Sequence, residues 1–128
     1  MKKIYLLTVL VSGFLFLTTQ SAIAQTEIPV ASFDENMVLT IPTDAELSPV
    51  YTVDISNMGF KDAAAADRFF RSMTDNLVNA KVDYAAQTAT VHLMLQYAPT
   101  PDWGVAKWNT YFTSVSSRYL GAYNKFNE

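Results

Sequence analysis

His92 is the side chain best suited by type to chemistry near neutral pH, since it is the one histidine of the sequence and imidazole titrates in that range. Met94 follows two positions later, and residues two apart on a strand face the same way. Imidazole and thioether groups bind soft ions such as Cu(I) and Ag(I). His92 and Met94 are therefore a candidate metal site, with another Met or a Trp supplying the remaining ligands. The simpler interpretation is a polar strand residue that faces water, because metal sites need several convergent ligands.

No catalytic constellation is evident around His92. A nucleophilic triad would combine it with Asp54 or Asp83 and a serine, but the late serines fall on a predicted helix that covers the opposite face of the sheet. The sequence has no Gly-rich phosphate loop and no zinc-type His/Glu cluster. It also has no cysteine, which excludes thiolate metal sites, disulfides and cysteine nucleophiles. We therefore predict no enzymatic activity and no cofactor.

Aromatic residues late in the chain supply a second candidate site. Three of them belong to an apolar helical stripe, which is usually core. The stripe comprises Val105, Trp108, Phe112, Val115 and Tyr119. Trp103, Tyr111 and Tyr123 fall outside it, so we predict an exposed aromatic patch for a protein, peptide or sugar. Isolated surface aromatics, which are common, are the alternative.

Strands and helices that position these residues follow from the apolar periodicity. The predicted order is strand 51–55, helix 62–79, strand 81–84, strand 89–96 and a helix from about 100 to 120. Asp62 is a favourable N-cap for the first helix. Thr100 and Pro101 are typical of the start of the second helix, and Gly121 is expected to end it.

These elements predict an α+β domain, in which an antiparallel sheet is covered on one face by two helices. Strand alternation places His92 and Met94 on the open face of that sheet. Asp54 and Asp83 should face the same way, so that His92 lies across from one of them. Residues 37–41 read as one more strand, at an edge of the sheet.

The first residues have the pattern of a secretory signal peptide. Two lysines open the chain, an apolar run covers residues 4–17, and a small-residue triplet follows at 22–24. We predict cleavage between Ala24 and Gln25, with an uncleaved membrane anchor as the alternative. The chain then divides into the signal peptide 1–24, a lead-in 25–50 and a domain 51–128. This pattern predicts export to a periplasm or to the outside, without stable membrane insertion after cleavage.

Charge argues against some classes of partner. The sequence has a formal net charge of −3, which becomes −5 when Lys2 and Lys3 leave with the signal peptide. An acidic domain without a Lys/Arg cluster is poorly suited to nucleic acid or to an anionic membrane surface. We therefore expect no nucleic-acid partner.

The stretch from Tyr51 to Leu95 has a recognisable pattern. Val53 and Ile55 lead a strand into Met58, a helix with an apolar stripe follows, and residues 79–91 read as turn, strand, turn and strand. This pattern resembles the heavy-metal-associated domain, the copper-chaperone type of ferredoxin-like fold. The resemblance implies a ferredoxin-like βαββα two-layer sandwich, with the third strand between the first and the second.

The positions that give that family its chemistry differ in this chain. The family binds soft metals through two cysteines of a Met-x-Cys-x-x-Cys loop, and Phe60 and Ala63 stand at those positions here. The thiolate metal function therefore does not carry over. No fourth strand is evident after the second helix, so residues 37–41 are expected to pair in the vacant place at the sheet edge.

Together these features predict an exported, non-enzymatic binding or protein-interaction module of the bacterial cell envelope. Its partner would be a protein or peptide, or a second copy through a sheet edge. The alternative is a periplasmic carrier of Cu(I) or Ag(I) with Met and His ligands.

Overall fold

The computed structural model describes residues 27–99 and 102–128. The predicted signal peptide and its cleavage site lie outside these ranges, as do Thr100 and Pro101 at the expected helix start. Among the described residues, no helix is long and apolar enough to cross a membrane.

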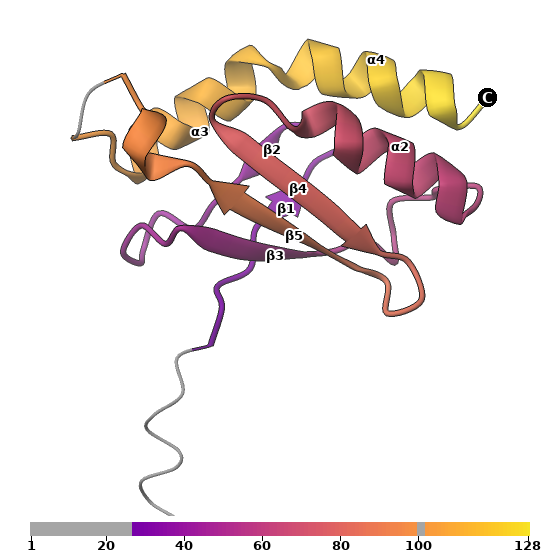
Figure 1. Ribbon diagram of the computed structural model, residues 1–128, viewed down its shortest axis with the longest axis horizontal. Coiled ribbons are helices and arrows are strands. Elements are labelled where there is room, and N and C mark those ends of the chain that lie inside the picture. The colour runs from indigo at the N-terminus through magenta and orange to yellow at the C-terminus, as the bar shows by residue number, and fades with distance from the viewer. Residues whose placement is uncertain (1–26, 100–101) are drawn as a thin grey trace, which may run out of the picture.

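The described chain forms two antiparallel sheets and three α-helices. The elements are β1 Ser32–Phe33, β2 Leu39–Thr40, β3 Val50–Asp54, α2 Ala63–Met73, β4 Val78–Asp83, β5 Thr88–Leu93, the 3₁₀ helix η1 Leu95–Tyr97, α3 Val105–Ser114 and α4 Ser116–Phe126. The main sheet has the strand order β3-β5-β4, and the small sheet pairs β1 with β2. Helices α2, α3 and α4 lie on the same side of the main sheet (Figure 1). The predicted α+β class is confirmed.

The main sheet buries one face and leaves the other open, as strand alternation requires. The buried face consists of Tyr51, Val53, Val78, Ala80, Ala89, Val91 and Leu93. The open face carries Val50, Thr52, Asp54, Asn79, Lys81, Asp83, Thr88, Thr90 and His92. A single apolar core, which includes Phe69, Trp108 and Tyr119, fills the space between the buried face and the helices.

The register places His92 opposite Asn79 on β4 and opposite the first residue of β3. The expectation that His92 faces Asp54 or Asp83 is therefore wrong. Both carboxylates lie opposite Thr88, which is about 13 Å from His92 along the strand. Alternation fixes the face of a residue, but the lengths of the connections fix its position along the sheet, and the sequence pattern does not give those.

Helix α2 is shorter than predicted. It begins after Asp62, whose side chain accepts a hydrogen bond from Ala65 N, so the predicted cap is confirmed. It ends at Met73 rather than Asn79, because the side chain of Asp75 accepts hydrogen bonds from the backbone of the next residues and turns the chain into β4. Side-chain acceptors of this kind compete with the helical backbone bonds.

The second predicted helix is two helices, joined at Val115 (φ −102°, ψ 3°). At this break the hydroxyl of Ser114 donates a hydrogen bond to the Tyr111 carbonyl, and the hydroxyl of Ser116 donates one to the Thr113 carbonyl. Gly121 does not end the second helix. It lies inside α4, which continues to Phe126, because Tyr123 and Phe126 still pack against the core.

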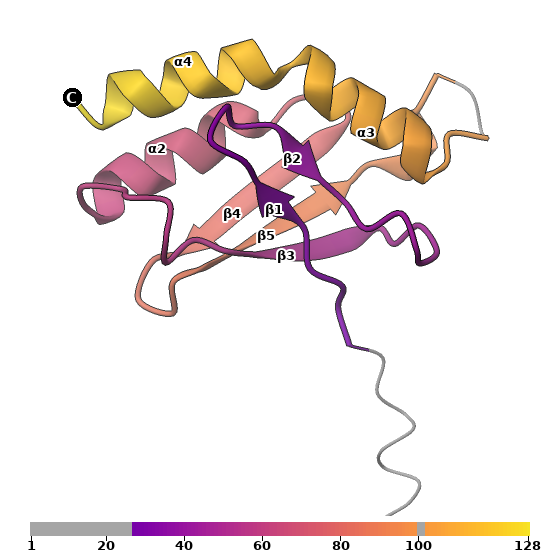
Figure 2. The ribbon, with the colours of Figure 1, turned by 180° about the vertical axis from the view of Figure 1, so that it is seen from behind.

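Residues 37–41 do not join the main sheet, contrary to the prediction. Leu39 and Thr40 pair with β1 in the small sheet, which stands in front of the main sheet between β3 and α3 (Figure 2). The edge of β3 is instead occupied by residues 29–31, through a parallel bridge between Val30 and Thr52. Ala31 N donates to Thr52 O at 2.8 Å, and Thr52 N donates to Pro29 O at 3.0 Å. The apolar run at 37–41 was misleading because the small sheet and the core also require buried side chains.

Candidate functional site

Asp75 organises the end of the main sheet at which β4 begins. It lies in the loop between α2 and β4, and its Oδ1 accepts hydrogen bonds from Leu77 N (2.8 Å) and Val78 N (2.9 Å). Thr74, Asp75 and Asn76 are turn-forming residue types. The carboxylate therefore sets the path of the chain from the helix into the strand.

The second oxygen of Asp75 joins this loop to the two late helices. Asp75 Oδ2 accepts a hydrogen bond from the Tyr111 hydroxyl of α3. It also accepts one from Arg118 Nη2 of α4, at 3.2 Å. The same guanidinium lies 5.3 Å from the ring centroid of Tyr119. One half-buried carboxylate thus connects three segments that are far apart in the sequence.

The ionisation of these groups reflects this geometry. Partial burial acts to raise the pKa of Asp75, but the hydrogen bonds from Tyr111, two backbone N–H groups and Arg118 outweigh it and lower the pKa below its ordinary value of 3.8. Burial, together with the hydrogen bond to Asp75, raises the pKa of Tyr111. At neutral pH the site therefore holds an ionised carboxylate and a protonated phenol.

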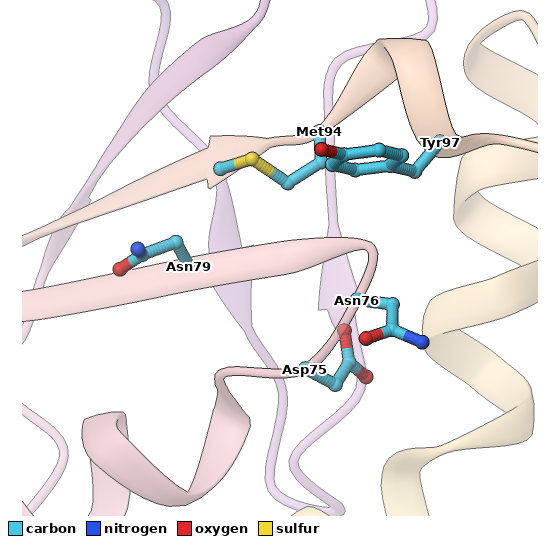
Figure 3. Close-up of a pocket in the computed structure, with 5 residues that line it drawn as sticks. All are labelled: Asp75, Asn76, Asn79, Met94 and Tyr97. Carbon is cyan, nitrogen blue, oxygen red and sulfur yellow. The ribbon is translucent and has the colours of Figure 1, made fainter.

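A cavity of about 580 Å³ opens beside Asp75 (Figure 3). Its wall is formed by Asp75 and Asn76 from the loop, Asn79 from β4, Met94 after β5 and Tyr97 from η1. Tyr97 is 63% exposed, one of the largest exposures of a large apolar residue in the described part of the chain. Two amide side chains beside an exposed ring suit a ligand that presents both amide or hydroxyl groups and an apolar surface.

The structure places the predicted metal residues next to this cavity. Met94 lines it, and His92 is the register partner of Asn79, which also lines it. His92 is half-buried on the open face. Within residues 27–99 and 102–128, no group of three or more His, Cys, Asp or Glu side chains is arranged to hold a metal ion.

The structure separates the three aromatic residues that the sequence predicts as one patch. Trp103 packs on Trp108 at 5.1 Å and lies 6.2 Å from Tyr111 between ring centroids. Tyr123 belongs to another neighbourhood, where its hydroxyl donates to the Met58 carbonyl and its ring packs on Phe60 at 5.4 Å. All three are half-buried against the core. Trp103 and Tyr111 therefore lie together, while Tyr123 tethers the loop after β3.

Apart from Met94, the residues that form the cavity wall were not predicted from the sequence. Asp75 had the one detectable signal, since Thr74, Asp75 and Asn76 form a short cluster of turn-forming residue types inside the predicted helix 62–79. Asn79 was expected in a helix, and Tyr97 in the connection after the third strand. Neither position has a local pattern that marks it as part of a cavity.

Comparison with known proteins does not add to this picture of the site. No protein-family model, curated protein or solved structure matches the chain. The chemistry of the cavity and of the sheet is thus what bears on function.

Proposed function

We propose that this chain is an exported, non-enzymatic binding module of the bacterial cell envelope, and that it holds an extended peptide segment of a protein partner in the cavity between Asp75 and Tyr97. The observation that carries this proposal is the cavity itself, with an exposed aromatic ring beside two amide side chains. Aromatic rings are enriched in protein interfaces because they bury a large apolar area.

The lining residues support a peptide as the ligand. The side-chain amides of Asn76 and Asn79 each donate and accept hydrogen bonds, as the backbone of an extended peptide also does. Tyr97 and Met94 supply the apolar contact, and methionine adapts its shape to different side chains. Asp75 adds little net charge, because Arg118 neutralises it.

We also propose a distant relation to the heavy-metal-associated domain and its ferredoxin-like sandwich. The strand order β3-β5-β4, with α2 between β3 and β4, is compatible with that fold. At the place of the family's first cysteine, the ring of Phe60 packs on Phe69 and Tyr123 at 5.5 and 5.4 Å. An aromatic contact thus stands where the family has a metal ligand, which supports a role other than thiolate metal transfer.

Export is the part of the proposal that rests on residues 1–24. The basic start, apolar run and small-residue triplet support it. Fractionation of bacteria that express the full chain, followed by mass spectrometry of the product, tests it. A periplasmic or secreted chain that begins at Gln25 is expected, and a full-length chain in the cytoplasm would refute export.

Photochemical cross-linking in the cells that encode the protein tests the binding site. A benzoylphenylalanine replaces Tyr97 in one variant and the exposed Thr113 of α3 in a matched control. We expect one discrete protein adduct from position 97 that is lost when Asn76→Ala and Asn79→Ala are added. Equal labelling from position 113, or labelling that survives the two substitutions, would overturn the proposed site.

The second candidate function is a Cu(I) or Ag(I) carrier. The observation in its favour is that His92 and Met94 flank Asn79 at the same end of the sheet. Titration of the purified protein with Ag(I), followed by the ring signals of His92 in NMR spectra, tests it. Stoichiometric binding that is lost in His92→Ala would favour the carrier, and unchanged His92 signals would remove it.

A further inference from the structure

The outer edge of β4 has a defined set of backbone groups. Val78 N donates to Asp75 Oδ1, Val78 O accepts from Asp75 N, and Ala80 N donates to Thr74 Oγ1. These partners lie on the α2 side, away from β5. Since successive residues of a strand point their backbone groups to opposite sides, Val82 also directs its N–H and C=O outward.

Within the described part of the chain, the first half of this edge has hydrogen-bond partners and the second half has none. The loop after α2 covers Val78 and the N–H of Ala80. Outside the β4–β5 ladder, no hydrogen bond of the described residues involves the Ala80 carbonyl, either backbone group of Val82, or the N–H of Tyr84. Unpaired strand edges of this kind are templates for a further strand.

We propose that β4 pairs antiparallel with β4 of a second copy of this chain, in a two-fold register centred on Val82. The main sheets of the two copies then form one continuous sheet. The proposal goes beyond the peptide-binding role and does not use the cavity beside Asp75.

Hydrogen bonding favours this register. In it, the two Val82 residues lie opposite each other and exchange two backbone hydrogen bonds. The carbonyl of each Ala80 accepts from Tyr84 N of the other copy, which adds two more. In a register centred on Lys81, Ala80 of each copy lies opposite Val82 of the other. Only two backbone hydrogen bonds can then form, because each Ala80 N–H already donates to Thr74 of its own chain.

Charge complementarity selects the same register and identifies the occupant as a second copy. Lys81 and Asp83 are both exposed on the open face. With Val82 at the centre, Lys81 of each copy lies opposite Asp83 of the other, which is a favourable cross-strand pair. Centring on Lys81 or on Asp83 would place like charges opposite each other, which is destabilising.

Side-chain volume is complementary as well. A groove of about 540 Å³ runs between α2 and the β4 edge, and its lining includes Phe70, Thr74, Ala80 and Val82. On the helix-covered side, the proposed register brings Tyr84 of the second copy opposite the small Ala80.

Charge reversal and its rescue test the pairing by sedimentation equilibrium of the purified protein. Wild type is expected to dimerise reversibly. Lys81→Glu, which sets two carboxylates opposite each other, should weaken the dimer about tenfold. Lys81→Glu combined with Asp83→Lys should restore it. Both positions are exposed, and unchanged thermal unfolding of a dilute sample controls for folding.

Directed disulfide formation tests the register itself, since the chain has no cysteine of its own. Directly opposed residues of a non-hydrogen-bonded pair have Cα atoms about 4.5 Å apart, within disulfide range. An oxidised mixture of Lys81→Cys and Asp83→Cys proteins should give the mixed dimer in excess over either homodimer, and exposed Ser117→Cys on α4 is the matched control.

A protein that stays monomeric at high concentration, charge reversal without effect, or mixed dimers no more frequent than with the control would overturn the proposal.

Discussion

The hydroxyl of Tyr111 donates a hydrogen bond to the carboxylate of Asp75, 36 positions earlier in the sequence. The bond connects α3 to the loop between α2 and β4, and Arg118 adds α4 through the same oxygen. Because the loop also forms part of the cavity wall, this pair links the packing of the helices to the shape of the proposed ligand site.

Removal of the Tyr111 hydroxyl should destabilise the protein. A hydrogen bond to a charged group contributes about 1.5–3 kcal/mol, and Tyr111→Phe removes the donor but keeps the ring that packs on Trp108. We expect the free energy of unfolding in urea to fall by about 1–3 kcal/mol. Tyr97→Phe, at an exposed ring, is the control and should change stability by less than about 0.5 kcal/mol.

The lowered pKa of Asp75 predicts a loss of stability in acid. In the unfolded chain this carboxyl has its ordinary pKa of 3.8, and in the folded protein the pKa is lower. The stabilisation by the ionised form is therefore complete above the unfolded pKa and is lost as the pH falls through the folded value. Urea unfolding of wild type and Asp75→Asn between pH 6 and pH 2 measures this. The stability difference should be largest near neutral pH and shrink below about pH 4, and a constant difference would contradict the prediction.

Much of the main sheet was predictable because its signal is local. Alternation at Tyr51 and Val53 identified a strand and its buried face, and Asp62 marked the start of α2. Both features depend on a few neighbouring residues, whose periodicity or capping chemistry is visible in the sequence.

The ends of the helices and the cavity depend on distant contacts, and for that reason the sequence did not reveal them. α2 ends just before Asp75, whose carboxylate accepts hydrogen bonds from the backbone N–H groups of Leu77 and Val78. The same carboxylate accepts a hydrogen bond from Tyr111 of a later helix. Gly121 has the residue type of a helix end, yet packing of the following turns keeps it helical. In each case tertiary contacts override a local preference.

Tyr119 should tolerate loss of its hydroxyl better than Tyr111. Its side chain is fully buried, and its hydroxyl makes no hydrogen bond of normal geometry in the described part of the chain, although the nearby Arg118 guanidinium acts to lower its pKa. A buried polar group without a partner is costly. Tyr119→Phe should therefore leave the free energy of unfolding unchanged or raise it by up to about 1 kcal/mol, as measured by urea unfolding. A loss as large as that of Tyr111→Phe would mean that the hydroxyl has a partner.

The same burial predicts a loss of stability in alkali. Burial, with a contribution from the charge of Asp75, raises the pKa of Tyr119 from 10.0 to about 12. The unfolded chain therefore releases this proton first, so stability falls as the pH rises from 10 to 12. Between pH 9 and 11 the loss from this group should be about 1 kcal/mol. Urea unfolding at the two pH values should show a smaller loss for Tyr119→Phe than for wild type, whereas equal losses would contradict the assignment.

Replacement of Gly121 by alanine should stabilise the protein, although the residue type suggested a helix end. Gly121 lies inside α4 at an exposed position, and apart from its chain neighbours and the backbone of its own helix, no atom of the described residues lies within 4 Å of the place that a Cβ would take. Alanine in a helix interior is favoured over glycine by about 0.5–1 kcal/mol, because glycine loses more backbone entropy on folding. Gly121→Ala should therefore raise the free energy of unfolding by that amount, seen as a higher urea midpoint at unchanged m-value. Gly59→Ala is the contrasting control, since its φ of +73° and the Tyr123 hydroxyl 3.2 Å from the new Cβ both disfavour a side chain. Destabilisation by Gly121→Ala would mean that α4 ends before this residue.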